Sequence, residues 1–231
     1  DLVEVGIYPL VLCLKDSPFA KDLQGLQGLE LIELDYRPRD FLDLRLKRQI
    51  AQLVQEGANV FHCHQPSVLG SFAPWLWNKR KVVLICSRHI MNHHDKRNPF
   101  HSMLYRRLDS FVVMSEAMRR NVAETHRLKD RQIRVIRYGL DFKQFDPERV
   151  DETSIREEWG VDRSTIVIGI VGRLDQAKGQ STFIRAAASL LGDTQDKAKR
   201  KKLKFVVVGE DTRGQKQSYM EVLKALVAQF H

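Results

Sequence analysis

The sequence predicts an α/β protein in which parallel strands alternate with helices, arranged as two successive units. Apolar runs of strand length, such as Val82–Cys86, alternate with longer segments of helical period up to Ile136. These runs are almost continuously apolar, which is typical of a parallel sheet covered on both faces. After Asp141 the chain becomes polar, and a second alternation starts at Ile166–Val171. A second unit with its own sheet is therefore expected.

Short apolar runs predict the strands of the first unit, and the spacing of apolar residues predicts its helices. The expected strands are Tyr8–Leu14, Leu29–Leu34, Val60–His62, Val82–Cys86, Phe111–Met114 and Ile133–Ile136. A helix is expected where apolar residues recur every three or four positions, as Leu46, Ile50 and Leu53 do. The expected helices are Phe19–Leu26, Phe41–Gln55, Leu69–Trp77, Phe100–Leu108 and Glu116–His126.

The second unit starts after a polar connection that contains Pro147 and a short helix near Ser154–Trp159. Its expected elements are strand Ile166–Val171, helix Ser181–Leu191, strand Phe205–Val208 and a helix from Gln217 onward. We divide the chain into a first domain (1–150), a connection (151–163) and the start of a second domain (164–231). Two strands are too few to bury a sheet, so we expect the second domain to be incomplete. Whether a strand precedes Tyr8 stays open.

The net charge of +9 is unevenly distributed along the chain. Residues 1–160 carry 25 basic and 22 acidic residues (net +3), and residues 161–231 carry 13 and 7 (net +6). Much of the second excess lies in the run Lys197–Lys204. Such a run can bind nucleic acid or an anionic membrane, but it contains no aromatic residue, and we favour a solvated helix end or loop.

The class of protein is indicated by the absence of a long apolar run and of a visible secretory signal, and by the positions of the cysteines. No apolar run approaches the ~18 residues of a membrane-spanning helix. No secretory signal is visible from Asp1 onward, although the chain could start after one. Cys13, Cys63 and Cys86 are odd in number and lie within or at the end of apolar runs, which is typical of buried thiols in a reducing compartment. We expect a cytoplasmic enzyme or binding protein.

The segment Ile168–Leu191 has the pattern of an anion-binding loop. A buried strand ends at Gly172, Arg173 and Lys178 follow in a short loop, and a helix begins after Gly179. Backbone N–H groups at a helix start attract anions, and the two cations suit a diphosphate. Taken alone this is a common type of loop, and it matches neither the Walker nor the dinucleotide fingerprint.

A second segment, Val135–Pro147, makes the loop more informative. Together the two resemble the GT-B-fold retaining glycosyltransferases of family four, which transfer sugars from nucleotide-sugar donors. Val135–Pro147 is similar to the pattern V-I-x-N-G-(V/I)-D-x-x-x-F-x-P, and Val171–Gly179 fits V-G-R-L-x-x-x-K-G without a gap. Strand-end Val208-Gly209 and the first-domain patterns at His62/His64, Ser87–His89 and Asp109–Glu116 are similar as well.

The resemblance implies two Rossmann-like domains that face each other across a cleft, and it implies roles for particular residues. Gly172, Arg173, Lys178 and Gly209 would bind the donor, a UDP-, GDP- or ADP-sugar. His89 would lie beside the reacting sugar and act in catalysis. Further cleft candidates are His62, His64, Ser115 and Gly139, although Ser115 also fits an N-cap. No metal or other cofactor is implied to be obligatory.

The sequence departs from the family pattern at a few points. Tyr138 stands where many members have Asn. The family's later Glu-x7-Glu pair would lie beyond His231, and its early Gly-rich loop is not found, so residues 1–231 alone are expected to be inactive. The acceptor implied is a glycan, such as lipopolysaccharide or another lipid-linked type, reached by peripheral contact with the inner face of an anionic membrane. Nucleic acid is not an expected partner.

Three alternatives remain at this point. His62 and His64 share one side of a strand and could begin a zinc site, but no closed set of four ligands is evident. A GT-B nucleotide-sugar epimerase is a second possibility, against which the Arg173–Lys178 loop argues. The third is a non-catalytic α/β module that binds nucleotides or polyanions.

Overall fold

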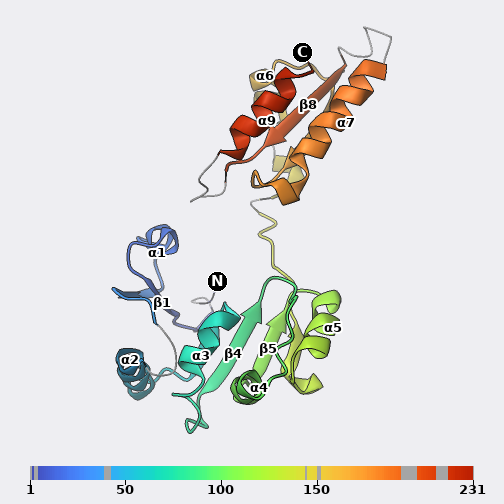
Figure 1. Ribbon diagram of the computed structural model, residues 1–231. Coiled ribbons are helices and arrows are strands. Elements are labelled where there is room, and N and C mark those ends of the chain that lie inside the picture. The colour runs from blue at the N-terminus through green and yellow to red at the C-terminus, as the bar shows by residue number, and fades with distance from the viewer. Residues whose placement is uncertain are drawn as a thin grey trace. The chain divides into compact units, whose positions relative to one another are not determined.

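The computed structural model describes residues 2, 5–38, 43–143, 145–149, 152–193, 202–211 and 218–230. The chain separates into two compact units, Asp1–Gly139 and Leu140–His231 (Figure 1). Within each unit every strand pairing is parallel, and helices connect the strands. The predicted α/β class with parallel sheets is therefore confirmed.

The first unit follows the predicted order of strands and helices. Its strands are β1 (Leu10–Leu14), β2 (Glu30–Leu34), β3 (Val60–Cys63), β4 (Val83–Arg88), β5 (Ser110–Val113) and β6 (Ile133–Val135). Its helices are α1 (Pro18–Leu23), α2 (Leu44–Gln55), α3 (Leu69–Phe72), α4 (Pro99–Arg106) and α5 (Glu116–Thr125). Phe41 and Leu42, which begin the second predicted helix, lie outside the described residues.

Side chains before the helices fix where several of them begin. Ser17, Asp43, Asn98 and Ser115 are N-caps whose side-chain oxygens accept hydrogen bonds from backbone N–H groups of the first turn. These bonds satisfy donors that have no partner within the helix. Proline follows the cap in α1 and α4, where its fixed φ suits the first turn and its missing N–H costs nothing.

One predicted helix is much shorter than expected. Leu69–Trp77 was predicted as a single helix, but α3 ends at Phe72 and the chain continues in turns. Pro74 explains the difference, because proline has no N–H to donate to the carbonyl four residues earlier. The turns carry the chain past Trp75 and Trp77 to the start of β4.

The strands of the first unit form a β1–β2 pair and a four-stranded sheet in the order β3-β4-β5-β6. In this sheet Cys63, Cys86, Phe111 and Ile133 lie in register across the four strands. All four belong to one buried core with residues of α2, α3, α4 and α5. Since neighbouring residues of a strand point to opposite faces, the core lies on one face of the sheet.

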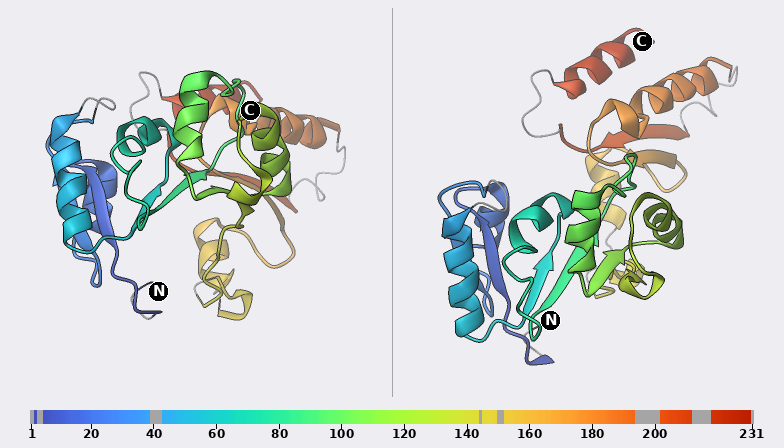
Figure 2. Two further views of the ribbon diagram at one scale, coloured as in Figure 1. Left: turned by 90° about the horizontal axis from the view of Figure 1, so that it is seen from below. Right: turned by 60° about the horizontal axis from the view of Figure 1, so that its bottom comes forward.

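The prediction that the sheet is covered on both faces is only partly met. Figure 2 shows α3, α4 and α5 along one side of the sheet, where the core packs. Val60 and Val83 are paired on the other face and are 54% and 40% exposed. The sequence was misleading here because nearly continuous apolar strands are typical of a sheet that is covered on both faces. The apolar pattern does not show which segment would cover the second face.

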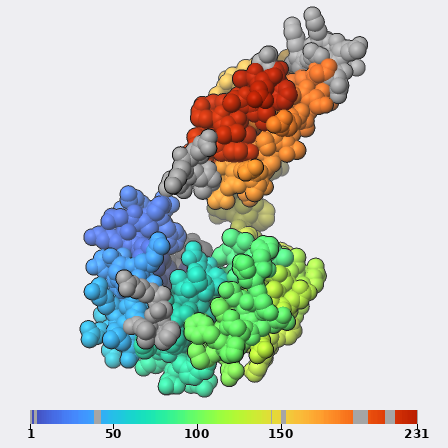
Figure 3. Space-filling view, viewed as in Figure 1, coloured from blue at the N-terminus to red at the C-terminus, as the bar shows by residue number. Residues whose placement is uncertain are grey.

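The described residues of the second unit form α6 (Glu152–Glu158), then a parallel pair of strands and two further α-helices. The pair is β7 (Ile166–Val171) with β8 (Leu203–Val208), and the helices are α7 (Gln180–Asp193) and α9 (Tyr219–Ala228). Helices α7 and α9 contact each other and form the orange and red surface in Figure 3. Their core contains Leu174, Ile184, Leu223 and Leu226. Most of the basic run Lys197–Lys204 and the predicted helix start at Gln217 lie outside the described residues.

The cysteines and the possibility of a membrane-spanning helix were the subject of two expectations from the sequence. Cys63 and Cys86 are buried free thiols, as predicted, and burial raises the pKa of the Cys63 thiol to about 12. Cys13 is half-buried. Among the described residues, no helix combines the length and the apolar character needed to cross a bilayer.

Candidate active site

The candidate site of the first unit is a row of aromatic side chains at the carboxyl edge of the four-stranded sheet. His62 and His64 come from the end of β3, His89 follows β4, and Tyr138 follows β6. The carboxyl ends of parallel strands meet at one edge, where open α/β sheets bind ligands. Residues far apart in the sequence are brought together there.

The row is held by ring contacts and two hydrogen bonds. The ring centroids of His62 and His64 are 4.1 Å apart, and those of His64 and His89 are 5.9 Å apart with nearly parallel planes. His62 Nε2 lies 2.7 Å from Ser87 Oγ, and His89 Nδ1 lies 2.7 Å from the Tyr138 hydroxyl. Of the predicted residues, His62, His64 and His89 therefore lie together. We name His62, His64, His89 and Tyr138 the histidine row.

The surroundings of His62 and His64 favour the neutral form of both imidazoles near pH 7. Partial loss of hydration lowers the pKa of His62, and the neighbouring His64 and His89 lower it further. The pKa of His64 is lowered by the same loss of hydration and by His89. Like charges so close would repel, so the neutral imidazole is favoured at these positions. A neutral ring can both accept and donate a hydrogen bond, as a sugar hydroxyl requires.

No metal centre is apparent in the described part of the chain. Within it, no three His, Cys, Asp or Glu side chains are grouped so that they could hold an ion. His62 and His64 share a face of β3, as predicted, but their rings contact each other and His62 bonds to Ser87.

The remaining first-unit candidates are Ser115 and Gly139. Ser115 Oγ accepts a hydrogen bond from Met118 N at 3.2 Å, so this side chain caps α5, one of the two roles foreseen for it. Gly139 ends the first unit, and a Cβ at its position would meet no atom within 4 Å. Gly139 directly follows Tyr138 of the histidine row in the chain.

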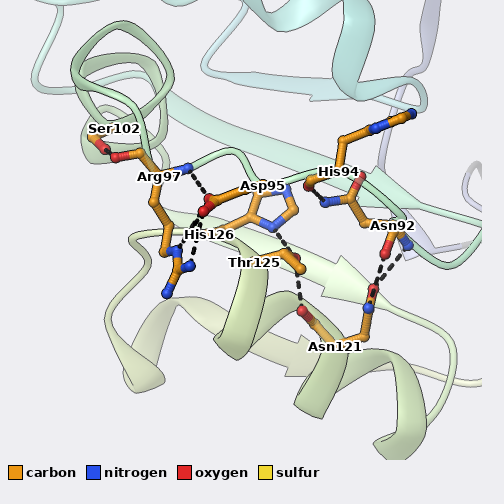
Figure 4. Close-up of polar contacts among 8 residues, drawn as sticks. All are labelled: Asn92, His94, Asp95, Arg97, Ser102, Asn121, Thr125 and His126. Atoms are coloured by element: carbon orange, nitrogen blue, oxygen red, sulfur yellow. Dashed lines mark hydrogen bonds and ion pairs between the residues drawn. The ribbon is translucent and has the colours of Figure 1, made fainter.

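The loop that carries His89 is held by polar residues that the sequence analysis did not single out. Arg88 donates to the carbonyl of Ile90 at 2.8 Å and to Asn92 Oδ1 at 3.1 Å. Asn92 is 4% exposed and exchanges two hydrogen bonds with Asn121 of α5, at 2.8 and 2.9 Å (Figure 4). These bonds fix the loop directly after His89 to a rigid helix.

The same loop is anchored a second time at the end of α5. Lys96 N donates to the Thr125 carbonyl at 2.8 Å, and Thr125 Oγ1 lies 2.8 Å from His126 Nδ1. His126 is 2% exposed and packs against the rings of Tyr105 and Phe111. Asparagine is a poor helix former, so the presence of Asn121 in α5 was a signal that its side chain has a tertiary partner.

A separate candidate site is the loop between β7 and α7 in the second unit. Gly172 N donates to the Val208 carbonyl at 2.9 Å, and Leu174 N donates to the Glu210 carbonyl at 2.8 Å. The loop thus extends the β7–β8 pairing past the strand end. A Cβ on Gly209 would overlap the Gly172 carbonyl, so glycine is required for this close approach.

The loop ends in a tight turn that directs the start of α7. Asp175 Oδ1 accepts from Ala177 N at 2.9 Å, and Gly179 has a left-handed conformation with φ of 81°. Gln180 is 1% exposed, and its Nε2 donates to the Arg173 carbonyl at 2.9 Å. Gly172, Arg173, Lys178 and Gly209 thus belong to one pair of adjacent loops, as the sequence motif implied.

The two cations of this loop are available to a ligand. The side chains of Arg173 and Lys178 are exposed, and neither has an ion-pair partner among the residues that the structure describes. Helix α7 begins one residue after Gly179, and its first N–H groups have no acceptor within the helix. Two cations beside such a helix start can neutralise a diphosphate.

Comparison with known proteins identifies the family. The model of Glycosyltransferase Family 4 matches residues 1–144. The chain belongs to this family. The glycosyltransferase match covers the whole first unit, including the histidine row and the loop that carries His89. The GT-B fold expected from the motifs agrees with this membership.

One curated relative and two solved structures extend the comparison. The chain is 34% identical over 103 residues to a D-inositol 3-phosphate glycosyltransferase of Corynebacterium jeikeium, a match that covers 44% of this chain and 23% of the relative. A glycosyltransferase structure from Rickettsia africae matches 99% of this chain and 59% of its own, with 17% identity and a TM-score of 0.78. A UDP-forming trehalose-phosphate synthase from Burkholderia xenovorans matches 81% of this chain and 48% of its own, with 19% identity and a TM-score of 0.56. At these identities the two structures support the fold of this family 4 chain.

Proposed function

We propose that this protein is a glycosyltransferase that moves a sugar from a nucleoside-diphosphate sugar to an acceptor hydroxyl, with retention of anomeric configuration. Membership of Glycosyltransferase Family 4 is the observation that carries the proposal. The exposed cations of the β7–α7 loop support it, because a departing nucleoside diphosphate gains negative charge that Arg173 and Lys178 can stabilise. Retention is taken from the family resemblance of the sequence motifs.

In this proposal each unit has its own task. The loop after β7 binds the diphosphate of a UDP-, GDP- or ADP-sugar, and Gly172 and Gly209 give the ligand access to the backbone. His89 lies beside the sugar and orients a hydroxyl or the reacting carbon. It need not act as a general base, because a front-face retaining mechanism requires no base from the protein.

The acceptor is proposed to bind at the first unit. The curated relative is named for an inositol phosphate, so a phosphorylated polyol is one candidate acceptor. A glycan of lipopolysaccharide or another lipid-linked glycan is the other, in which case the protein would act in the cytoplasm at an anionic membrane surface. Both acceptors present hydroxyl groups, which neutral imidazoles such as His62 and His64 can bind.

Calorimetric titration of the chain with UDP, GDP and ADP tests the donor site. We expect one of the three to bind, and Arg173→Ala or Lys178→Ala to weaken it at least tenfold, since each removes a charge-assisted contact worth ~1.5–3 kcal/mol. Arg163→Ala is the matched control, because Arg163 is exposed in the same unit outside the loop.

The outcome separates the proposal from its alternatives. Equal affinity in the loop variants and the control would contradict a diphosphate site in this loop. Binding without transfer of sugar to any acceptor by the full-length protein would favour a nucleotide-binding module. Conversion of a nucleotide sugar to its epimer would favour the epimerase.

A further inference from the structure

A second concave site lies at the opposite edge of the same four-stranded sheet. It is a pocket of about 560 Å³, lined by Trp77, Arg80, Arg106, Arg107, Leu108, Asp109, Lys129, Arg131 and Gln132. Trp77 and Arg80 precede β4, Asp109 precedes β5, and Arg131 precedes β6. The pocket therefore lies where the strands begin, whereas the histidine row lies where they end. We name it the amino-edge pocket.

The two sites are separated by the length of the sheet. Strand β4 has six residues, which at ~3.3 Å each span ~20 Å. Every residue of the amino-edge pocket belongs to the first unit, so the pocket is complete without the second. It is not a part of the donor loop or of the histidine row.

The pocket is strongly cationic and its charge is not neutralised. Five basic side chains line it against a single carboxylate, Asp109. Asp109 Oδ2 already accepts hydrogen bonds from Leu84 N at 2.8 Å and from Arg107 at 2.9 Å. Arg80, Arg106, Lys129 and Arg131 have no ion-pair partner in the described ranges of the chain. Cations held around a hollow repel one another and attract an anion, which would relieve that repulsion.

The frame of the pocket is rigid. The side chain of Arg107 is 8% exposed and donates to the carbonyls of Leu76 at 2.7 Å and Val82 at 2.7 Å, besides Asp109. Gln132 Nε2 donates to the Leu108 carbonyl at 2.6 Å. These bonds join the segments before β4, β5 and β6, so Arg107 and Gln132 are structural. Arg80, Arg106, Lys129 and Arg131 are left to contact a ligand.

We propose that the amino-edge pocket binds an anion with two or more phosphate charges, held by Arg80, Arg106, Lys129 and Arg131. The pocket volume is typical of small-molecule sites and exceeds what one phosphate needs. Guanidinium groups bind phosphate through paired N–H donors, and three of the four cations are arginines. Trp77 adds an aromatic wall to the same pocket. The phosphates come either from a soluble phosphorylated compound or from phospholipid head groups.

Two binding assays test the site on the same set of proteins. All are made in the Arg173→Ala/Lys178→Ala background, so that the proposed donor loop contributes no binding. The pocket variant is Arg80→Ser/Arg131→Ser, which leaves Arg107 and its hydrogen bonds intact. The control is Arg48→Ser/Arg120→Ser, which removes the same charge from two exposed arginines of the first unit that do not line the pocket.

One assay is calorimetry with inorganic pyrophosphate at low ionic strength. The other is flotation with phosphatidylcholine vesicles that contain or lack 30 mol% phosphatidylserine. We expect the pocket variant to lose at least tenfold in one of these affinities while the control keeps it, with unchanged circular dichroism in both. Loss of pyrophosphate binding identifies a soluble ligand, and loss of vesicle binding alone identifies lipid head groups.

Two results would overturn the proposal. One is absence of binding to both probes by the parent protein. The other is an equal loss in the pocket variant and the control, which would show that net charge alone attracts the anions. Because the donor loop is already removed, neither result bears on the proposed transferase function.

Discussion

Acidification should destabilise the first unit through His126. This side chain is 2% exposed, and its Nε2 is buried without a hydrogen-bond partner in the described structure. Burial lowers the pKa of His126 from 6.5 to about 4, and the positive groups Arg88, Lys96 and His101 contribute to the lowering. The folded protein therefore holds a neutral imidazole at pH values where the unfolded chain holds a protonated one.

The magnitude follows from the difference between the two pKa values. The folded and unfolded pKa values of His126 differ by about 2.5, which at ~1.36 kcal/mol for each tenfold change in proton affinity corresponds to roughly 3 kcal/mol. Because the folded pKa is the lower one, this stability is fully present above pH 6.5 and is lost as the pH falls from 6.5 to about 4. A domain of ordinary stability, ~5–15 kcal/mol, would lose a large part of it in this range.

Urea unfolding between pH 7.5 and pH 4.5 measures the effect. A Trp159→Phe background restricts tryptophan fluorescence to Trp75 and Trp77 of the first unit. The free energy of unfolding should fall steeply as the pH is lowered in the parent protein, and less steeply in His126→Leu. His93→Leu, at an exposed histidine, is the control and should keep the parent slope. The same slope in His126→Leu as in the parent would refute the reasoning.

Three further variants test other parts of the structure. His89→Ala should lower turnover by the full-length protein more than tenfold, or ~1.4 kcal/mol of transition-state stabilisation, with nucleoside-diphosphate affinity unchanged; unchanged turnover would remove His89 from the site. Gly209→Ala should cost more than ~1 kcal/mol and abolish nucleoside-diphosphate binding, because its Cβ would overlap the Gly172 carbonyl; Gly192→Ala, with open space at the Cβ position, should not. Asn121→Ala should destabilise the first unit by ~1–3 kcal/mol, because the backbone N–H and carbonyl of Asn92 lose their partners, and hydrogen exchange of residues 90–98 should accelerate; exchange at the parent rate would contradict the anchoring of this loop by Asn121.

The order of elements could be predicted from the sequence because it depends on local pattern. Short apolar runs such as Val82–Cys86 are strands, and the loop after Gly172 leads into a helix at Gln180 as expected. The errors arose where one residue overrides its neighbours. Pro74 shortens α3 although the apolar spacing continues through Trp77.

The site could be predicted only where its residues form a motif. Arg173 and Lys178 are close in sequence, and the histidines lie at strand ends, so both sets could be singled out from the sequence, and their roles stay predictions. Asn92 and Asn121 are 29 residues apart, and their pairing depends on how the loop packs on α5. The amino-edge pocket was missed for the same reason, because its cations come from three separate segments of the chain. The basic run that stands out in the sequence itself is Lys197–Lys204, which belongs to the second unit.

The electrostatics of the histidine row, and separately those of the β7–α7 loop, support the task proposed for each. A retaining transfer develops positive charge at the anomeric carbon and negative charge on the departing diphosphate. Protonated histidines beside the sugar would oppose the first of these charges, and the lowered pKa values of His62 and His64 keep both rings neutral near pH 7. The positive charge is instead concentrated at Arg173 and Lys178, where it would stabilise the leaving group. If His62 or His64 were protonated at neutral pH, as nitrogen chemical shifts of the imidazoles would reveal, this separation of charge would fail and a role of the histidine row beside the reacting sugar would lose its electrostatic basis.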